Sequence, residues 1–210
     1  MRPLAILGGT FDPVHLGHLR AAWEAAEALD AEVRLVPANV PPHRPAPLAS
    51  AQQRVAILRA ALAGQDRLAL DTRELDRGGA SYTVDTLASL RGEIGPQRPL
   101  VLLLGADAFA LLPTWNRWRE LLDLAHVGVL TRPGHVPPLP GELAAEIAPR
   151  EANDPQALRA SPSGHVLRIA ITPLEISATK VRALLREGRE PRWLLPDALL
   201  ADPELLAPYR

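Results

Sequence analysis

Two histidines three residues apart, His15 and His18, follow a double glycine near the start of the chain. Residues 4–7 form an apolar run, which predicts a buried strand. Gly8 and Gly9 carry no Cβ, so the backbone can turn sharply there and a ligand can approach it closely. Apolar residues then recur at helical spacing from residue 14, which places both histidines on one face of a helix's opening turn. Free amides and the positive end of the helix dipole lie at the same place, so an anion is the expected ligand.

A second segment with anion-binding chemistry lies near the C-terminus, at residues 176–182. Ser177 is a good N-cap for the helix predicted to follow, and Thr179 adds a hydroxyl beside the free amides of the first turn. Arg182 lies one turn further, so its guanidinium can fold back toward an anion at the helix start. By itself this segment is equally typical of an ordinary surface helix. Together with the first segment it indicates a polyphosphate lying between two helix starts.

Other chemistries lack their motifs in this chain. A histidine near a helix start is most often a surface or capping residue, and paired histidines can also bind zinc. The chain has no cysteine, and no acidic residue completes a ligand set, so we expect no dedicated metal site. It has neither a P-loop nor a Gly-x-Gly-x-x-Gly motif, and no side chain stands in the setting of a covalent nucleophile. We expect Asp12 and His43 to be turn and loop residues.

Composition favours small molecules as binding partners. The chain has 210 residues, with 23 basic and 24 acidic side chains and a net charge of −1. This balance leaves no basic patch for nucleic acid and no polybasic patch for a membrane. No apolar stretch approaches the roughly 20 residues that span a bilayer, and the N-terminus enters a strand without a signal peptide. The sequence therefore predicts a cytoplasmic protein, and it carries no signal for an oligomeric state.

Strands and helices alternate along the predicted chain. Apolar runs predict strands at residues 4–7, 32–37, 67–71, 100–104, 126–130 and 166–171. Helical periodicity follows most of them, and the pattern indicates a single-domain α/β fold. We expect a doubly wound, Rossmann-like, mainly parallel sheet with helices on both faces, formed by residues 1–210. The proline-rich residues 133–163 look like a surface insertion without chemistry.

Several of the polar groups follow strands and should meet at one edge of this sheet. Gly8 and Gly9 end the first strand, Asn39 follows the second, and Gly105 and Asp107 follow the most apolar strand. The carboxyl ends of parallel strands lie at a common edge, where ligands bind at the switch in strand order. These groups are therefore expected to converge in space.

Both segments resemble the signatures of a known superfamily. Residues 8–18, with the sequence GGTFDPVHLGH, and residues 176–182, with the sequence ISATKVR, are similar to the motifs of the nucleotidyltransferase superfamily with the His-x-Gly-His motif. Residues 37–44, 81–83 and 112–115 look more narrowly like the bacterial nicotinate-nucleotide adenylyltransferase family. The matches run in the family's order from residue 4 to about 196, and only residues 133–163 lack an obvious counterpart.

The resemblance implies adenylyl transfer from ATP to nicotinate mononucleotide, giving nicotinate adenine dinucleotide and pyrophosphate in NAD biosynthesis. Carried over by motif, the catalytic residues would be His15, His18 and Arg182. The ATP-binding residues would be Gly8, Gly9, Thr10, Phe11, His15, His18, Gly105, Asp107, Ser177, Thr179 and Arg182. Nicotinate mononucleotide would be bound by Asn39, Arg44, Thr83 and Trp115, the indole stacking on the pyridine ring. Mg²⁺ would be carried mainly by the ATP phosphates.

Two positions depart from the family pattern. Asn116 follows Trp115 where an aromatic residue is common, so carboxylate recognition there would rest on the backbone amide. Ala38 precedes Asn39 where another asparagine is common. Nicotinamide mononucleotide or phosphopantetheine remain alternative acceptors, and a regulator that binds a nucleotide without turnover is an alternative of another class.

Overall fold

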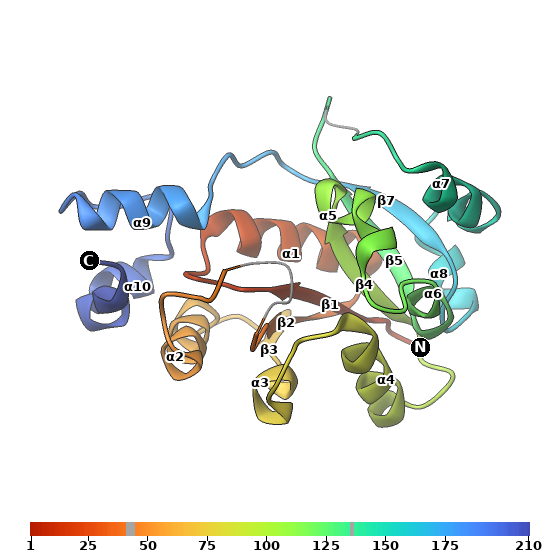
Figure 1. Ribbon diagram of the computed structural model, residues 1–210, viewed down its shortest axis with the longest axis horizontal. Coiled ribbons are helices and arrows are strands. Elements are labelled where there is room, and N and C mark those ends of the chain that lie inside the picture. Colours follow the sequence, from red (N-terminus) through yellow and green to blue (C-terminus); the bar gives the residue numbers. More distant parts are fainter. Residues whose placement is uncertain (41–44, 135–136) are drawn as a thin grey trace.

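The computed structural model describes residues 1–40, 45–134 and 137–210, and within them the chain forms a seven-stranded sheet (Figure 1). Every neighbouring pair of strands is parallel, and the strand order is β3-β2-β1-β4-β5-β7-β6. The strands are β1 (Leu4–Gly9), β2 (Glu32–Pro37), β3 (Leu68–Leu70), β4 (Leu100–Gly105), β5 (His126–Thr131), β6 (Glu151–Ala152) and β7 (Val166–Ala170). The predicted doubly wound α/β fold is confirmed.

Side chains alternate between the two faces of the sheet, as the two-residue period of a strand requires. In β1, Leu4 and Ile6 join one buried cluster, whereas Ala5 and Leu7 join the other. The Ala5 face is covered by α1 (Leu16–Leu29), α2 (Ala51–Ala61), α8 (Ala157–Ala160), α9 (Ala178–Arg186), α10 (Asp197–Ala201) and the 3-10 helix at Pro203–Tyr209. The Leu4 face is covered by α4 (Thr83–Ile94), α5 (Ala106–Ala110), α6 (Glu120–Leu124) and α7 (Gly141–Ile147). A further short helix, α3 (Arg73–Arg77), lies between β3 and α4.

The order of the strands reverses between β1 and β4. From β1 the chain builds outward through β2 and β3 on one side, and through β4, β5 and β7 on the other. The carboxyl ends of β1 and β4 are therefore neighbours, with Leu7 paired to Leu103. A crevice at such a switch point is where open α/β sheets bind ligands.

The last helices lie far from β7, which precedes them. Figure 1 shows α9 and α10 at the opposite end of the molecule from α7. The connecting segment is held against α1, because the Thr172 amide and hydroxyl donate to the Glu24 carboxylate at 2.6 Å and 2.5 Å. This connection brings the start of α9 back to the switch point.

Within residues 133–163, the described part that begins at residue 137 contributes to the body of the protein. Leu143 and Leu158 within this segment have no exposed surface, and β6 extends the sheet beyond β7. Because β6 is only two residues long and has no apolar run, the sequence did not predict it. That this segment is an insertion, and that the chain is one domain, stay predictions. No helix in the described ranges has the length and apolar character that a bilayer crossing needs.

Candidate active site

The turn after β1 is built around the Phe11 ring. A Cβ on Gly9 would come within 2.9 Å of the ring's Cζ, so only glycine leaves room for it. Phe11 has a φ of 49° and is 2% exposed, so a buried ring holds the backbone in a conformation rare for L-residues. A Cβ on Gly8 would meet nothing within 4 Å. The sequence predicted that a ligand could approach the backbone at both glycines. In the structure the space beside Gly8 is empty, whereas the Phe11 ring fills the space beside Gly9.

The two predicted histidines lie against each other at the start of α1. Their ring centroids are 3.7 Å apart with an interplanar angle of 22°, and the Phe11 ring meets His18 edge-on at 5.1 Å. The His15 amide donates to His18 Nδ1 at 3.4 Å, so the pair also caps the helix. His15 is buried, whereas His18 is partly exposed.

Burial changes the charge of His15. It lowers the pKa of His15 to about 4, so the ring is neutral at pH 7. Gly17 makes this burial possible, because a Cβ there would lie 3.1 Å from His15 Nδ1.

The backbone amides at this helix start are less free than the sequence suggested. The Leu16 amide donates to the Leu194 carbonyl at 2.9 Å, and the His18 amide donates to the His15 carbonyl at 2.9 Å. The prediction of an open set of amides was therefore wrong for these two residues. Anion binding at this place rests more on side chains than the sequence indicated.

The start of α9 reaches the turn after β1. Ser177 caps α9 as predicted, its Oγ accepting from the Lys180 amide at 3.2 Å. Arg182 folds back toward the helix start, where its Nη2 donates to Thr179 Oγ1 at 3.4 Å. Its Nη1 donates to the Asp12 carbonyl oxygen at 2.7 Å. The two segments that the sequence singled out are therefore in contact.

The residues predicted to bind the second nucleotide gather around the start of α4. The Asn39 amide donates to Ser81 Oγ at 2.8 Å, and its side-chain nitrogen donates to the Gly79 carbonyl at 3.0 Å. Thr83 is the first residue of α4. The loop of Trp115 is held to the same helix by an ion pair between Arg117 and Asp85 at 3.1 Å.

Trp115 itself is partly buried and packs against the core on the Leu4 face of the sheet. Arg44, predicted to reach the mononucleotide phosphate, lies outside the described residues.

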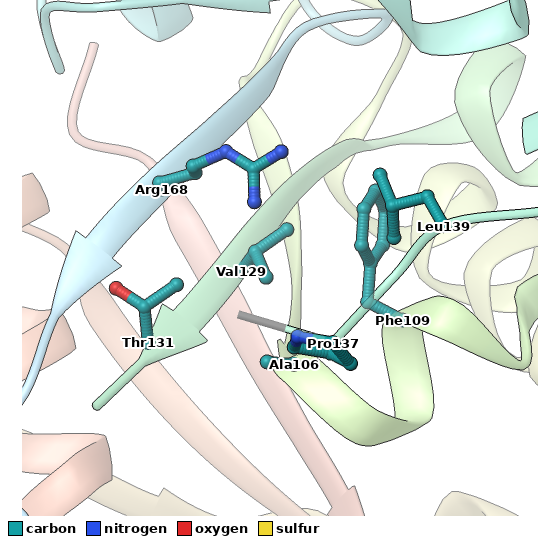
Figure 2. A pocket seen from close by; sticks show the side chains of 7 residues that line it. All are labelled: Ala106, Phe109, Val129, Thr131, Pro137, Leu139 and Arg168. Carbon is teal, nitrogen blue, oxygen red and sulfur yellow. The ribbon is translucent and has the colours of Figure 1, made fainter. Parts of the chain in front are cut away.

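The end of β4 supplies the remaining predicted groups. Gly105 caps α5, and Asp107 lies exposed in the first turn of that helix, beside the switch point. Figure 2 shows a small pocket nearby, formed by side chains of α5, β5, β7 and the loop before α7. Its volume of about 10 Å³ is enough for about one water molecule, not for a nucleotide base. In the described residues, no three His, Cys, Asp or Glu side chains group as metal ligands would.

Two buried polar residues beneath the site, Arg54 and Tyr209, were not predicted from the sequence, and Asp12, which lies in a turn as expected, is buried with them. Asp12 is 6% exposed and accepts from the Leu48 and Ala49 amides at 2.9 Å and 3.1 Å. Arg54 and Tyr209 are each 1% exposed, and the charge of Asp12 acts on both of them. Arg54 had a detectable signal, because it shares a helix face with Ile57 and Leu58 at i+3 and i+4.

Comparison with known proteins identifies the family. The sequence model of the family described as Cytidylyltransferase-like matches residues 6–184. A "Probable nicotinate-nucleotide adenylyltransferase" of Methylococcus capsulatus is 51% identical, covering 94% of both chains. Another of that name, from Pseudomonas syringae pv. tomato, is 49% identical over 100% of this chain and 94% of its own length.

Solved structures share the fold. Nicotinic acid mononucleotide adenylyltransferase of Plasmodium falciparum, complexed with NaAD, has a TM-score of 0.69 at 16% identity and covers 96% of each chain. The same Plasmodium enzyme complexed with APC has a TM-score of 0.65. The chain belongs to the cytidylyltransferase-like family and, within it, to the nicotinate-nucleotide adenylyltransferases.

Proposed function

We propose that this protein transfers the adenylyl group of ATP to nicotinate mononucleotide, giving nicotinate adenine dinucleotide and pyrophosphate. The observation that carries the proposal is the bond from Arg182 to the Asp12 carbonyl, which joins the two anion-binding segments at the switch point. The names of relatives about 50% identical along nearly the whole chain support the choice of substrates.

The ATP phosphates are proposed to lie between the turn after β1 and the start of α9. Backbone of Gly8, Gly9, Thr10 and Phe11, with the side chains of His15, His18, Ser177, Thr179 and Arg182, would contact ATP. Gly105 and Asp107 would meet its ribose or metal ion. Arg182 fits this role because Asp12 and Thr179 already hold its guanidinium near both segments. A guanidinium held in advance loses less conformational entropy when an anion binds.

Nicotinate mononucleotide is proposed to lie on the α4 side, against Asn39, Thr83 and Trp115, with Arg44 at its phosphate. The Asn39 side-chain nitrogen donates a hydrogen bond to the Gly79 carbonyl. This bond fixes the orientation of the carboxamide and therefore the position of its oxygen. The partly buried indole offers a rigid face on which a pyridine ring can stack. Amides near Thr83 and Asn116 would recognise the carboxylate.

The chemical step needs alignment and charge stabilisation. The mononucleotide phosphate is ionised at neutral pH, so its oxygen can attack the α-phosphorus of ATP without a general base, and pyrophosphate leaves. Catalysis then rests on holding both groups in line and stabilising the charge that develops on the phosphoryl oxygens. His15, being neutral, can donate one hydrogen bond to such an oxygen, while Arg182 supplies a positive charge.

A divalent cation, Mg²⁺, is proposed to enter with ATP, because this ion is usually bound through substrate phosphates and one or two carboxylates. Asp107 fits a hydrated ion, since its carboxylate lies exposed beside the switch point. When bound, the ion would neutralise charge on the phosphates. We expect thorough chelation to abolish turnover and added Mg²⁺ to restore it, measured as pyrophosphate release.

The deciding experiment compares three acceptors under identical conditions. Purified protein with ATP and Mg²⁺ is given nicotinate mononucleotide, nicotinamide mononucleotide or phosphopantetheine, and pyrophosphate release is followed. We expect the highest kcat/KM with nicotinate mononucleotide. Preference for another acceptor would overturn the substrate assignment. Folded protein that binds ATP and releases no pyrophosphate with any acceptor would overturn the enzymatic function.

A further inference from the structure

Arg54 connects the two loops that the proposed function assigns to different substrates. Its Nη1 donates to the Thr10 carbonyl at 2.9 Å and to the Ala38 carbonyl at 2.7 Å. Thr10 lies in the turn after β1, on the ATP side, and Ala38 directly precedes Asn39, on the mononucleotide side. One nitrogen atom therefore bridges the two loops one residue beyond the last backbone bond between them, which runs from the Ala38 amide to the Gly9 carbonyl at 2.9 Å.

The arginine is embedded rather than attached at the surface. It is 1% exposed, and it extends from the buried face of α2 among Ile57 and Leu58. Burying a guanidinium is costly unless charge and hydrogen bonds compensate it. Burial lowers the pKa of Arg54, whereas the Asp12 charge opposes that change. A leucine or methionine would avoid the cost of desolvation but would leave the Thr10 and Ala38 carbonyls without this donor, so the link between the two loops is what the buried cation provides.

Asp12 extends the same arrangement to the rest of the site. Its carboxylate accepts from the Leu48 and Ala49 amides, which lie just before α2, and Oδ2 is 3.8 Å from Arg182 Nη1. The helix that carries Arg54 is thus attached to the residue that also holds Arg182. A shift of α2 would move the ATP loop, the mononucleotide loop and Arg182 relative to one another.

We propose that Arg54 is a positioning residue for adenylyl transfer, which sets the distance between the ATP loop and the mononucleotide loop through the Thr10 and Ala38 carbonyls. This inference rests on the proposed function. Arg54 is buried beneath the site, so its effect passes through the two loops. Without it, both substrates still bind, but the attacking oxygen and the α-phosphorus are out of line.

Arg91 offers a matched control at the other edge of the sheet. Like Arg54 it donates to backbone carbonyls, although it is only partly buried. Its partners are the carbonyls of Gly95, Arg98, Leu124 and Pro162 at 2.7 to 3.1 Å. Burial lowers its pKa as well. It lies in the last turn of α4, at the opposite end of that helix from Thr83, and it holds loops near the amino ends of the strands. Its substitution therefore tests loss of a carbonyl-binding arginine without disturbing the switch point.

The test compares Arg54→Lys and Arg54→Met with Arg91→Lys and Arg91→Met. Thermal midpoints, ATP binding stoichiometry, kcat and the KM of each substrate are measured, with kcat expressed per ATP-binding site. We expect all four variants to unfold at lower temperature. Arg54→Met should lose roughly 100-fold in kcat, the cost of a misplacement of about 1 Å, with smaller changes in either KM. The kcat of Arg54→Lys should lie between those of the wild type and Arg54→Met, because lysine keeps a donor but lacks the fixed fork of arginine. Both Arg91 variants should keep the wild-type kcat.

The outcomes separate positioning from stability. Arg54 variants with wild-type kcat per site and unchanged KM values would overturn the inference, whatever their thermal midpoints. If Arg54→Met does not fold, Arg54→Lys decides by the same criterion. Wild-type protein that binds both nucleotides without releasing pyrophosphate would overturn the proposed function alone. Arg54 would then be judged by how binding of one nucleotide changes the affinity for the other: a change in this coupling in Arg54→Lys but not in Arg91→Lys supports the inference, and equal coupling overturns it. Wild-type protein that binds neither nucleotide overturns both.

Discussion

At the scale of single residues, the geometry assigns the two histidines different properties. His15 is buried and neutral at pH 7, whereas His18 is partly exposed and has the Phe11 ring at its edge. His18 is thus the one with more access to a ligand. The sequence could predict that the pair shares one face, because a three-residue spacing fixes this. It could not predict the stacking, which depends on where Phe11 and Gly17 leave room.

His18→Ala should lower kcat by roughly 10²- to 10³-fold, the usual cost of removing one donor to a developing negative charge. Folding should survive, since His18 is not part of the buried core. His165→Ala is the control, because that ring also stacks on a buried histidine, His126, with centroids 5.4 Å apart. Pyrophosphate release gives kcat, and circular dichroism checks the fold. A near-normal kcat in His18→Ala would remove this residue from the mechanism.

Gly17→Ala should act on catalysis through the position of His15. The added Cβ would lie 3.1 Å from Nδ1 and 3.2 Å from Cε1, so the imidazole must move. We expect kcat to fall by about 10-fold or more. Gly92→Ala is the control, since it lies inside α4 and its Cβ would meet nothing within 4 Å. That variant should keep its activity and gain roughly 0.5 to 1 kcal/mol in stability. Equal kcat values for the two variants would contradict this role of Gly17.

At the scale of elements, the N-terminus of α9 combines a structural and a functional task. Ser177→Ala removes a cap bond of 3.2 Å, and Ser50→Ala removes an equivalent bond of 3.2 Å from α2. Each loss should cost about 1 kcal/mol in the free energy of unfolding. Only Ser177→Ala should also raise the KM of ATP, by roughly 2- to 10-fold, the value of one hydrogen bond. An unchanged KM in Ser177→Ala would make Ser177 a cap alone.

Strands with an apolar pattern of their own were predictable, whereas the two-residue β6, which has none, was not. The segments at β1, β4 and β5 carry their own signal, because strands covered on both faces need apolar side chains throughout. In α2 the buried face includes Arg54, whereas Val55 is only partly buried. No neighbouring residue in the sequence explains why a cation lies on the buried face of this helix. Its partners, Thr10 and Ala38, are 44 and 16 residues away, so only the folded chain reveals them.

At the scale of the whole molecule, the two edges of the sheet have different tasks. The carboxyl edge gathers the residues proposed for both substrates, whereas the amino edge is closed by side chains bonded to carbonyls. At that edge, His126 at the start of β5 has no exposed surface, and its Nε2 is 2.9 Å from the Ser161 carbonyl. Its Nδ1 accepts from the His165 amide at 3.0 Å. Among residues 1–40, 45–134 and 137–210, each edge holds one buried histidine, His15 or His126, and both affect how stability depends on pH.

Stability should fall as the pH drops from 7 to 5. Burial lowers the pKa of both His15 and His126 to about 4, whereas an unfolded chain titrates them near 6.5. Between these values the unfolded state binds more protons, so protonation favours unfolding, and stability is regained as the pH rises through 6.5. Each histidine should cost about 2 kcal/mol between pH 7 and pH 5. Carboxylates such as Glu93, whose pKa Arg73 and Arg34 hold low, add their effect only below about pH 4.5.

Urea unfolding at pH 7 and pH 5 measures this difference, and His126→Gln separates the two contributions. The variant should be less stable than the wild type at pH 7, because a glutamine cannot reproduce both hydrogen bonds of the buried ring. Its loss of stability between pH 7 and pH 5 should nevertheless be about half that of the wild type, since only His15 then resists protonation. Equal losses in the two proteins would show that His126 takes up its proton equally well in the folded and in the unfolded state, which would overturn the part of this prediction that rests on its burial.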